Sequence, residues 1–496
     1  MRPQGPGAVD RRTLLAGALL LPAALWPAGA SAVPGVDEPP PAAPPRPLQM
    51  PPLHEFVLAN GLTGVVAPRP GLPLVSLTLL VRAGAEADPP GRPGVAAMTA
   101  ALWSKGALRD GRPVPAPELA RQAEALGSAL DTRSGFGASS LGMTVTTPRA
   151  EAALALMADA LRRPLLAADE LERARLQALD ALRVTLGSPG EVSALVLRRA
   201  FWGPVPHGAV TSPAALQRLQ RTDLQAFQSR WVRPDRVSLV LAGDITPEAG
   251  QALARRLLGD WHAPAIAPPT PLLAPPTPLR QPLVLVDMPG AGQASVALAA
   301  PFVASRAADR RIGLVAQAVL GGGYSARLMQ EVRIKRGLSY GVAAGVEAFA
   351  PGGMFSAQAQ THHPGAAEVL QLMRSEVLRL ADAPPAPDEL AARQATLVGA
   401  FSRRLETNGG VAALVVAQLA QGRPLADLAD HVPALLAVTP AQVQAFARRH
   451  WTADALRAVV VGDLAAAGEP LAAGAGPALR LTMAELDLEA PGLRQP

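Results

Sequence analysis

Apolar positions along this chain recur with two different spacings. Alternation at every second position, typical of strands, covers residues 54–66, 75–81, 128–133 and 137–146 and returns at Val237. A spacing of three to four positions, typical of helices, covers residues 93–103, 117–126, 149–161, 169–186, 189–201 and 222–231. Within the first segment, Asn60-Gly61 predicts a type I′ hairpin turn. Because strands and helices interleave without regular β-α-β spacing, the pattern predicts an α+β fold with an antiparallel-rich mixed sheet packed with helices.

The chain also repeats itself at an offset of 219 residues. The segment from Ala226-Phe227 to Gly243-Asp244 matches the one from Ala445-Phe446 to Gly462-Asp463. The same offset pairs Ser76 with Ser295, Gly94 with Gly313, and Asp169-Glu170-Leu171 with Asp388-Glu389-Leu390. A single long offset indicates two copies of one domain, because a solenoid would show more repeats at a shorter period.

Proline-rich segments mark the limits of the two copies. Residues 33–52 predict an extended leader, and residues 264–282 predict a linker at the midpoint. The two copies therefore occupy residues 53–263 and 283–478. The weak periodicity of residues 479–496 predicts an irregular tail.

Residues 1–32 have the pattern of an export signal. Asp10-Arg11-Arg12 is a twin-arginine opening, an apolar run to Leu25 follows, and Ala30-Ser31-Ala32 is a small-x-small cleavage site. We therefore expect a mature chain that begins near Val33 in a bacterial periplasm. No membrane anchor is expected, because the apolar run is too short for a good span and a chain without cysteine has no lipobox.

The formal net charge of +6 and the isoelectric point of about 10.6 do not by themselves predict nucleic-acid binding. Arginine supplies 44 of the 46 basic residues, and the charges are scattered without a basic run or interleaved aromatic residues. The hydrophobic fraction of 49% is ample for two cores. The absence of cysteine excludes disulfides in any compartment.

The segment Leu320–Tyr340 holds both tyrosines of the chain and its run of three glycines. It predicts a glycine-rich turn, a basic amphipathic helix that ends at Gly337, and a strand that begins at Leu338. Arg333 then lies in the last helical turn, and Tyr340 lies just beyond it. An arginine offers a rigid fork of hydrogen-bond donors, and a tyrosine adds one hydroxyl. By spacing alone, the pattern also fits a capped helix with a solvated Arg333 and a half-buried Tyr340.

A second segment, which begins at Gly94, has the frame of a metal motif without its ligands. Its sequence Gly94-Val-Ala-Ala-Met-Thr-Ala-Ala-Leu-Trp-Ser-Lys-Gly106, together with Leu320–Tyr340, resembles the signatures of the insulinase/pitrilysin family of zinc peptidases. Members of that family carry an inverted H-x-x-E-H motif inside the same frame. The resemblance puts the two histidine positions at Ala97 and Ala101, the general-base glutamate at Ala100, and the third ligand at Ala181 beside Asp180. Alanine has no atom that binds zinc.

No other segment predicts a catalytic centre. The histidines are never three or four positions apart, the spacing that puts two ligands on one helix face. Cysteine ligands are absent, and no G-x-S-x-G elbow marks a serine nucleophile. The sequence therefore predicts no catalytic residue, no metal ligand and no cofactor in this chain.

The resemblance implies two homologous domains that face one another as a clamshell, and a substrate-binding role for Arg333 and Tyr340, which in that family hold the backbone of a bound peptide. It also implies a partner, a paralogue with an intact H-x-x-E-H motif and bound zinc, in a heterodimer or larger assembly. The first hypothesis is therefore a periplasmic, non-catalytic subunit of a heteromeric zinc metallopeptidase that binds and positions extended peptides. The alternatives are an inert scaffold or peptide-binding protein without a peptidase partner, and a peptidase with an improvised metal site.

Overall fold

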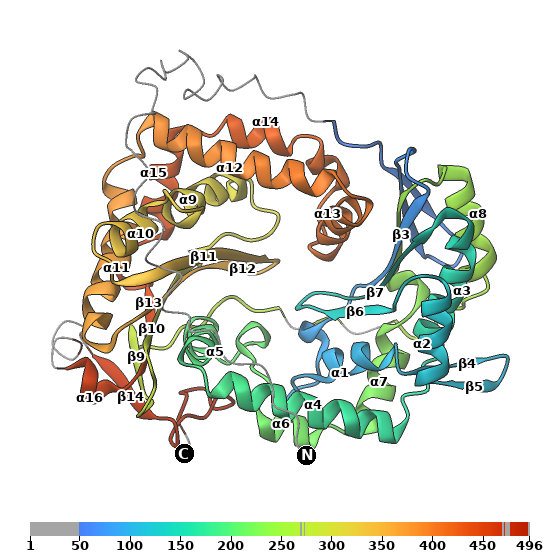
Figure 1. Ribbon diagram of the computed structural model, residues 1–496, viewed down its shortest axis with the longest axis horizontal. Coiled ribbons are helices and arrows are strands. Elements are labelled where there is room, and N and C mark those ends of the chain that lie inside the picture. Colours follow the sequence, from blue (N-terminus) through green and yellow to red (C-terminus); the bar gives the residue numbers. More distant parts are fainter. Residues whose placement is uncertain (1–48, 268–269, 272, 469–470, 472–476, 495–496) are drawn as a thin grey trace, which may run out of the picture. The chain divides into compact units, whose positions relative to one another are not determined.

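The computed structural model describes residues 49–267, 270–271, 273–468, 471 and 477–494 (Figure 1). The expected export signal, residues 1–32, and most of the leader, residues 33–52, lie outside the described residues. None of the described helices has both the length and the apolarity that a membrane crossing requires.

The first half of the chain forms a mixed sheet that has six strands within the described residues. In spatial order these are β1 (His54–Val57), β2 (Thr63–Pro68), β8 (Val237–Gly243), β3 (Leu74–Val81), β7 (Ser139–Thr146) and β6 (Asp131–Ser134). All neighbours are antiparallel except β2 and β8. Every residue of β8 is buried, as expected for a central strand that is covered on both faces.

The second half forms a matching sheet, again with six strands in the described part of the chain. In spatial order these are β11 (Ser339–Phe349), β12 (Gly352–Thr361), β10 (Ala294–Phe302), β13 (Arg457–Gly462), β9 (Leu283–Asp287) and β14 (Ala478–Thr482). Strand β9 is parallel to both β13 and β14, and the other pairs are antiparallel. From β11 to β9 the order repeats that of β6, β7, β3, β8 and β2 in the first sheet, which confirms the α+β fold of two homologous halves.

Helices pack against both sheets. In the first half these are α1 (Val95–Leu102), α2 (Ala116–Ala125), α3 (Ala150–Arg162), α4 (Ala168–Leu186), α5 (Pro189–Trp202), α6 (Pro213–Arg218), α7 (Arg221–Trp231) and α8 (Pro247–Leu258). In the second half they are α9 (Arg310–Gly321), α10 (Arg327–Met329), α11 (Ala366–Asp382), α12 (Pro387–Leu405), α13 (Asn408–Ala420), α14 (His431–Leu436), α15 (Pro440–His450) and α16 (Leu464–Ala467). The 219-residue offset holds at both ends of α4 and α12, and of α7 and α15.

Two helices are exchanged between the halves. Helix α5 comes from the first half of the chain but packs on β10 and β13 of the second sheet (Figure 1). Helix α13, its equivalent in the repeat, packs on β3 and β8 of the first sheet. Val192 and Val196 of α5 are fully buried in one cluster with Val459 and Val461 of β13. Each sheet therefore depends on the other half of the chain to cover one of its faces.

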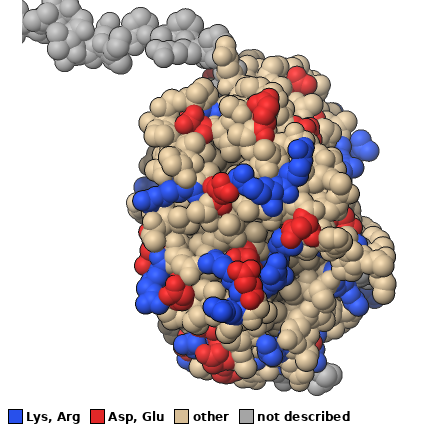
Figure 2. Space-filling view, turned by 90° about the vertical axis from the view of Figure 1, so that its right-hand side faces the viewer, with Lys and Arg blue, Asp and Glu red and all other residues tan. Residues whose placement is uncertain are grey.

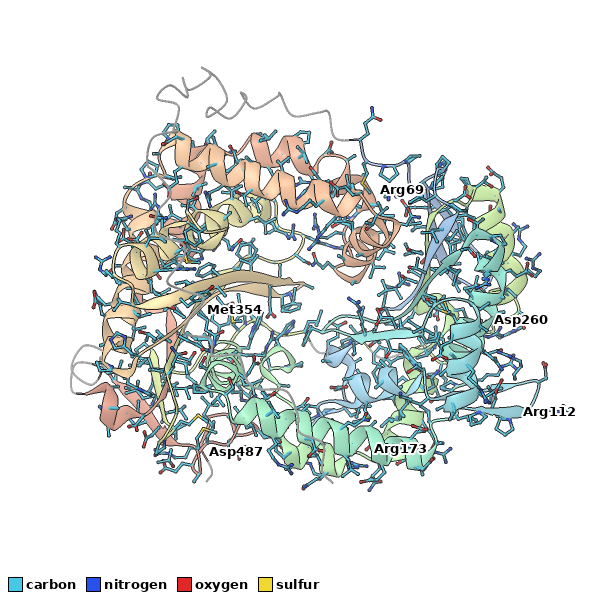
Figure 3. The ribbon with its side chains drawn as sticks, in the orientation of Figure 1. Arg69, Arg112, Arg173, Asp260, Met354 and Asp487 are labelled. Atoms are coloured by element: carbon cyan, nitrogen blue, oxygen red, sulfur yellow. The ribbon has the colours of Figure 1, made fainter. Side chains whose placement is uncertain are left out.

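Polar contacts hold both exchanged helices in place. Asn408, the first residue of α13, donates through Nδ2 to the carbonyl oxygen of Leu74 at 2.8 Å. Arg69, labelled in Figure 3, donates through Nη1 to Oδ1 of the same asparagine at 3.1 Å. On the other helix, the buried hydroxyls of Ser193 and Ser295 lie 2.8 Å apart. Apolar packing buries each exchanged helix, and these polar contacts, which have defined partners, fix its position on the sheet.

Charged side chains are mixed on the face shown in Figure 2, where basic and acidic groups lie side by side without a large patch of one sign. This face corresponds to the right-hand side of Figure 3, where Asp260 is labelled. Asp260 accepts a hydrogen bond from Arg162 at 2.8 Å, and the guanidinium lowers the pKa of that carboxyl. On this face the charges have the scattered arrangement that the sequence indicates.

The first hairpin turn and the adjoining region differ from expectation. A type I′ turn needs two consecutive residues with positive φ, and in this turn only Gly61 has one, at +87°. The backbone N–H of Gly61 donates to Leu58 at 2.9 Å, so the turn begins at Leu58 instead. A hairpin of β4 (Gly106–Arg109) and β5 (Arg112–Pro115), which the pattern does not predict, follows α1.

The tail expected at residues 479–496 is irregular only beyond β14 (Ala478–Thr482), to which its first residues belong. Strand β14 pairs in parallel with β9, and beyond it Leu488 and Leu493 are buried in the cluster that contains α5. Arg199 of α5, itself buried, donates to the carbonyl oxygens of Glu489 at 2.8 Å and Ala490 at 3.2 Å. Beyond β14 the tail is attached to the second half by two separate leucines and by Arg199. It therefore needs no continuous apolar face, and its sequence shows no periodicity.

Candidate functional site

The helix that carries the degenerate metal motif, α1, is intact. Gly94 precedes it with a φ of +101°, and the two carboxylate oxygens of Asp88 accept hydrogen bonds from the backbone N–H groups of Gly94 and Ala96, each at 2.7 Å. Burial raises the pKa of Asp88 to about 7, against the effect of these two hydrogen bonds. After the helix, Gly106 has a φ of +114°, and a Cβ there would lie 2.9 Å from the carbonyl oxygen of Val114. The frame that the sequence identifies is therefore a defined local structure.

The four positions of the metal motif lie on two helices that pack together. On α1, Ala97 is exposed, Ala100 is buried and Ala101 is half-buried. On α4, which contacts α1, Ala181 is exposed. Alanine provides neither a ligand nor a general base, but it has the highest helix propensity of all residues. Both helices therefore form, although these positions supply neither a zinc ligand nor a general base.

No neighbouring group replaces these side chains. Asp180, next to Ala181, accepts a hydrogen bond from Nη1 of Arg183 at 2.8 Å on the exposed side of α4. Among the described residues, no group of three or more histidine, aspartate and glutamate side chains lies close enough together to hold a metal ion. The donor set for zinc is therefore missing from the motif, and the described part of the chain offers no second one.

The glycine run after α9 brings the chain against β11. A Cβ on Gly321 would lie 2.2 Å from the Cβ of Ala344, so only glycine allows this close approach. The short helix α10 follows and continues into one π-helical turn, Gln330–Ile334. Gly337, with a φ of +64°, ends it, and β11 begins at Ser339. The predicted turn, helix and strand are present, with a π-helical turn in place of a regular last turn.

Two arginines anchor this segment to α12, the repeat equivalent of α4. Arg327 binds the carboxylate of Glu389 with two hydrogen bonds, from Nε at 2.7 Å and from Nη2 at 2.8 Å. The carboxylate raises the pKa of Arg327. Arg393, which is buried, donates through Nη2 to the hydroxyl of Ser325 at 2.5 Å. Since two-point arginine contacts fix orientation, the loop and the short helix are held in a defined position.

The structure brings Arg333 together with both tyrosines of the chain. The guanidinium carbon lies 4.5 Å from the ring centre of Tyr340 and 4.9 Å from that of Tyr324. Tyr340 is 88% exposed and Tyr324 is 58% exposed. The predicted neighbours Arg333 and Tyr340 are therefore in contact, and the half-buried Tyr340 that spacing alone would also fit is not observed. Their role in holding a peptide stays a prediction.

Arg333 differs from the two basic residues that follow it, Lys335 and Arg336, in the groups that it contacts. Lys335 and Arg336 both pair with Glu331, at 2.5 Å and 2.6 Å, and the two cations lower the pKa of that glutamate. Arg333 forms no ion pair or hydrogen bond with any described side chain or carbonyl and contacts the two rings instead. Its N–H groups are therefore free for a ligand.

Tyr324 is the member of this cluster that sequence reasoning misses. It follows the glycine run directly, and its distance from Arg333 along the chain gives no indication of contact. The available signal is composition, because the chain has two tyrosines and both lie in this one segment.

The strand that begins beside this cluster, β11, is one of the two edge strands of the second sheet, and β14 is the other. Its pairing with β12 is irregular between Ser339 and Val342, at the position of Tyr340. Its sequence contains no lysine and no proline, and its one charged residue, Glu347, is bound by Nη2 of Arg198 at 2.5 Å and 2.6 Å. Natural edge strands are usually shortened, charged or interrupted by proline, so β11 has little of the usual protection. Its backbone is partly used, since Gln317 donates through Nε2 to the carbonyl oxygen of Ala344 at 3.1 Å.

The corresponding edge of the first sheet, β6, is different. Strand β6 has only four residues, and Arg133 on it binds Asp131 at 2.9 Å, with both side chains exposed. A short, charged edge is the usual form of protection against another strand. The open edge and the exposed Arg333 cluster therefore occur together in the second half of the chain.

Two family descriptions match the chain. Insulinase (peptidase family M16) matches residues 65–202, and peptidase M16 inactive domain matches residues 218–397. The first range contains α1 and its alanine frame, and the second contains Arg333 and Tyr340. The chain belongs to the insulinase family of peptidases. It is an inactive homologue, and the sequence resemblance puts alanine at the positions of the metal ligands and the general base.

Similar curated sequences carry the name uncharacterized zinc protease. The one from Mycobacterium tuberculosis (strain H37Rv) is 30% identical over 210 residues, 42% of this chain and 48% of that protein. The one from Streptomyces coelicolor is 34% identical over 158 residues, 32% of this chain and 34% of that protein. The chain thus spans about half the length of the mycobacterial relative and a third of the streptomycete one.

Solved structures share the fold over most of the chain. A peptidase M16 inactive domain from Pseudomonas fluorescens has a TM-score of 0.73 and 25% identity, and the match covers 83% of this chain and 98% of that one. A protease from Helicobacter pylori has a TM-score of 0.76 and 20% identity, covering 83% and 99%. The fold expected from the sequence resemblance is confirmed.

Proposed function

We propose that this chain is the non-catalytic subunit of a heteromeric zinc metallopeptidase. In this role it binds extended peptides through Arg333 and Tyr340 and positions them for a partner chain that carries an intact H-x-x-E-H motif and the zinc. The observation that carries the proposal is the combination, in one chain, of an alanine-substituted metal frame with a half-buried arginine whose guanidinium lies over two exposed rings and has no hydrogen-bond partner among the described residues.

The chemistry of the cluster suits a peptide backbone. A guanidinium has five N–H donors in a rigid fork, and the hydroxyl of Tyr340 adds another donor. Hydrogen bonds from a charged donor to a carbonyl oxygen are stronger than those between neutral groups. An extended peptide presents carbonyls at regular intervals whatever its side chains are, so Arg333 and Tyr340 can bind many sequences.

The open edge of β11 supports the same role. An extended peptide can add to an exposed sheet edge by main-chain hydrogen bonds, which is a common mode of peptide recognition. Tyr340 lies at the start of this strand, so a peptide paired along β11 would pass the Arg333 cluster. The strand would hold the peptide in extended form, and the cluster would fix its position along the edge.

The division of work between two chains follows from what this one lacks. Peptide hydrolysis by zinc needs three protein ligands, an open position for water and a general base. This chain supplies none of these at Ala97, Ala100, Ala101 and Ala181. Correct positioning of a substrate can account for a large part of a rate enhancement, so a subunit without ligands can still be essential.

Copurification and reconstitution test the proposal. The tagged chain, expressed in its native host, should copurify at a fixed ratio with an M16 paralogue whose H-x-x-E-H motif is intact. The pair should cleave unstructured peptides in a chelator-sensitive reaction, and this chain alone should not. In the pair, Arg333→Ala should lower kcat/KM roughly tenfold to more than a hundredfold, the loss of one charged hydrogen bond. Arg336→Ala is the matched control and should leave kcat/KM unchanged, because Arg336 is bound to Glu331.

Other outcomes would support the alternatives. A chain that binds peptides but copurifies with no zinc-bearing paralogue is a peptide-binding protein. A chain that binds neither peptides nor a paralogue is an inert scaffold, and Arg333 is then a surface residue.

We also propose that the complex acts in the periplasm. Support comes from the twin-arginine pattern of Arg11-Arg12 and the cleavage site at Ala30-Ser31-Ala32, which lie outside the described residues. Changing both arginines to lysine should keep the tagged chain in the cytoplasm with its signal uncleaved. Unchanged export of that variant would refute twin-arginine transport.

A further inference from the structure

We propose that Tyr324 is a positioning residue of the peptide-binding site: its ring holds the guanidinium of Arg333 in the orientation that presents the N–H groups to a peptide. The inference rests on the proposed function, since it assigns Tyr324 a role in the same site.

The contact itself is the first observation. Arg333 lies over two rings, 4.9 Å from the centre of Tyr324 and 4.5 Å from that of Tyr340, within the range of cation–π attraction. A solvated arginine samples many rotamers, and fixing its long side chain costs entropy. Contact with two rings restricts the plane of the guanidinium before a peptide arrives.

Contacts with aromatic rings leave the N–H donors of a guanidinium free, whereas an ion pair uses some of them. A carboxylate binds the N–H groups that lie in the plane of the guanidinium, whereas an aromatic ring contacts its face. Lys335 and Arg336 in the same segment each use one nitrogen, Nζ and Nη1, to donate to the carboxylate of Glu331. Arg333 is held by rings, so its donors stay available to carbonyl oxygens.

The backbone that carries Tyr324 is itself fixed. Gly321 packs on β11 with no space for a Cβ, and Ser325, the next residue after Tyr324, accepts a hydrogen bond from the buried Arg393. The side-chain amide of Gln330 donates to the carbonyl oxygen of Tyr324 at 3.3 Å. A ring that is 58% exposed therefore projects from a rigid loop, which is the arrangement that positioning requires.

Burial does not explain the placement of Tyr324. An apolar ring contributes to stability in proportion to the area it removes from water, and more than half of this side chain remains exposed. Both tyrosines of the chain contact the same guanidinium. The contact with Arg333 is the interaction that distinguishes this position from an ordinary surface site.

A fluorine label tests the geometry without any peptide. Protein labelled with 3-fluorotyrosine should give two ¹⁹F resonances, because the chain has two tyrosines, and Tyr324→Phe and Tyr340→Phe assign them. Arg333→Ala should shift both resonances, and the control Arg336→Ala should shift neither. If the Tyr324 resonance does not respond to Arg333→Ala, the ring does not hold the guanidinium and the inference is overturned.

Peptide affinity tests the role. The probe is a fluorescein-labelled dodecapeptide, chosen from a random library by retention on the immobilised wild-type chain. Tyr324→Leu should weaken its binding roughly two- to fivefold, the factor that corresponds to one exposed cation–π contact, whereas Tyr324→Phe should bind like wild type. Equal affinity of the leucine and wild-type chains, or equal losses in the leucine and phenylalanine variants, would overturn the positioning role. If the wild-type chain retains no peptide, the proposed function fails, and the fluorine experiment still decides the contact.

Discussion

A buried histidine should make the stability of this protein sensitive to acid. The side chain of His207 is 1% exposed, and neither of its ring nitrogens has a hydrogen-bond partner among the described residues. Its ring stacks on Phe136 with a centroid distance of 3.8 Å and on Trp202 with 4.5 Å. Burial, aided by the charge of Arg198, lowers the pKa of His207 to about 4. The folded state therefore requires this imidazole to be neutral.

The sign and size of the effect follow from linkage. The unfolded histidine titrates with a pKa of about 6.5, so below that value the unfolded chain binds a proton that the folded chain does not. The contribution of His207 to stability is fully present above pH 6.5 and is lost as the pH falls towards 4. Between pH 8 and pH 5 the loss is about 2 kcal/mol, from the difference of the two pKa values.

His207→Phe tests this reasoning because phenylalanine keeps a flat ring and removes both nitrogens. At pH 8 the variant should be at least as stable as wild type, since no hydrogen bond is lost. At pH 5 its advantage should be larger by about 2 kcal/mol. Urea unfolding followed by tryptophan fluorescence at several pH values gives both free energies.

A control and a second histidine complete the design. His54→Phe, on the exposed strand β1, is the control for replacing a histidine outside the core. His431, whose pKa burial and neighbouring arginines also lower to about 4, should keep part of the acid sensitivity in the His207→Phe chain. Unfolding free energies of wild type and His207→Phe that run parallel from pH 8 to pH 5 would refute the assignment.

Further predictions concern the metal frame and the exchanged helices. The purified chain alone should bind no stoichiometric zinc, and one zinc per chain after dialysis would contradict this. The combined variant with Ala97→His, Ala100→Glu, Ala101→His and Ala181→Glu should bind zinc more tightly than the wild-type chain when measured by calorimetry. It should show little peptidase activity, because the groups that orient metal ligands are absent. Turnover like that of an ordinary family peptidase would disprove this prediction. Asn408→Ala should lower the unfolding free energy by about 0.5–1.5 kcal/mol, since the carbonyl of Leu74 and the side chain of Arg69 each lose one hydrogen bond but keep another, to Asp244 and Glu406. An unchanged denaturation midpoint would exclude a role of Asn408 in fixing α13.

The sequence predicts the local elements of this protein better than their assembly. The offset of 219 residues anticipates the limits of α4 and α12, because both helices keep the same start and stop signals. The exchange of α5 and α13 has no signal in the pattern, since an amphipathic helix shows that it has a buried face but not which sheet covers it. The hairpin β4–β5 is missed for a related reason, as its short strands are half-exposed and contain two prolines.

The candidate site shows the same limit. Seven positions separate Arg333 from Tyr340, and the intervening Gly337 indicates that the helix ends between them, so their proximity follows from local rules. Tyr324 reaches the same guanidinium in a segment where Gly321 lies against Ala344 and a π-helical turn spans Gln330–Ile334. Such turns insert one extra residue into a helix and frequently occur at functional sites, but apolar spacing does not predict them.

The metal frame and the arginine cluster differ in how far the fold explains them. Helix α1 is needed without zinc, because Val95 and Leu102 are fully buried and Trp103 donates to Gln228 at 2.9 Å. Packing therefore accounts for a helix whose ligand positions have become alanine. No such account covers Arg333, which forms no ion pair with any described residue and lies over two exposed rings beside the edge strand β11. Since the fold does not require that arrangement, the proposed ligand fits it: the carbonyls of an extended peptide can accept from Arg333, and its backbone can pair with the outer edge of β11.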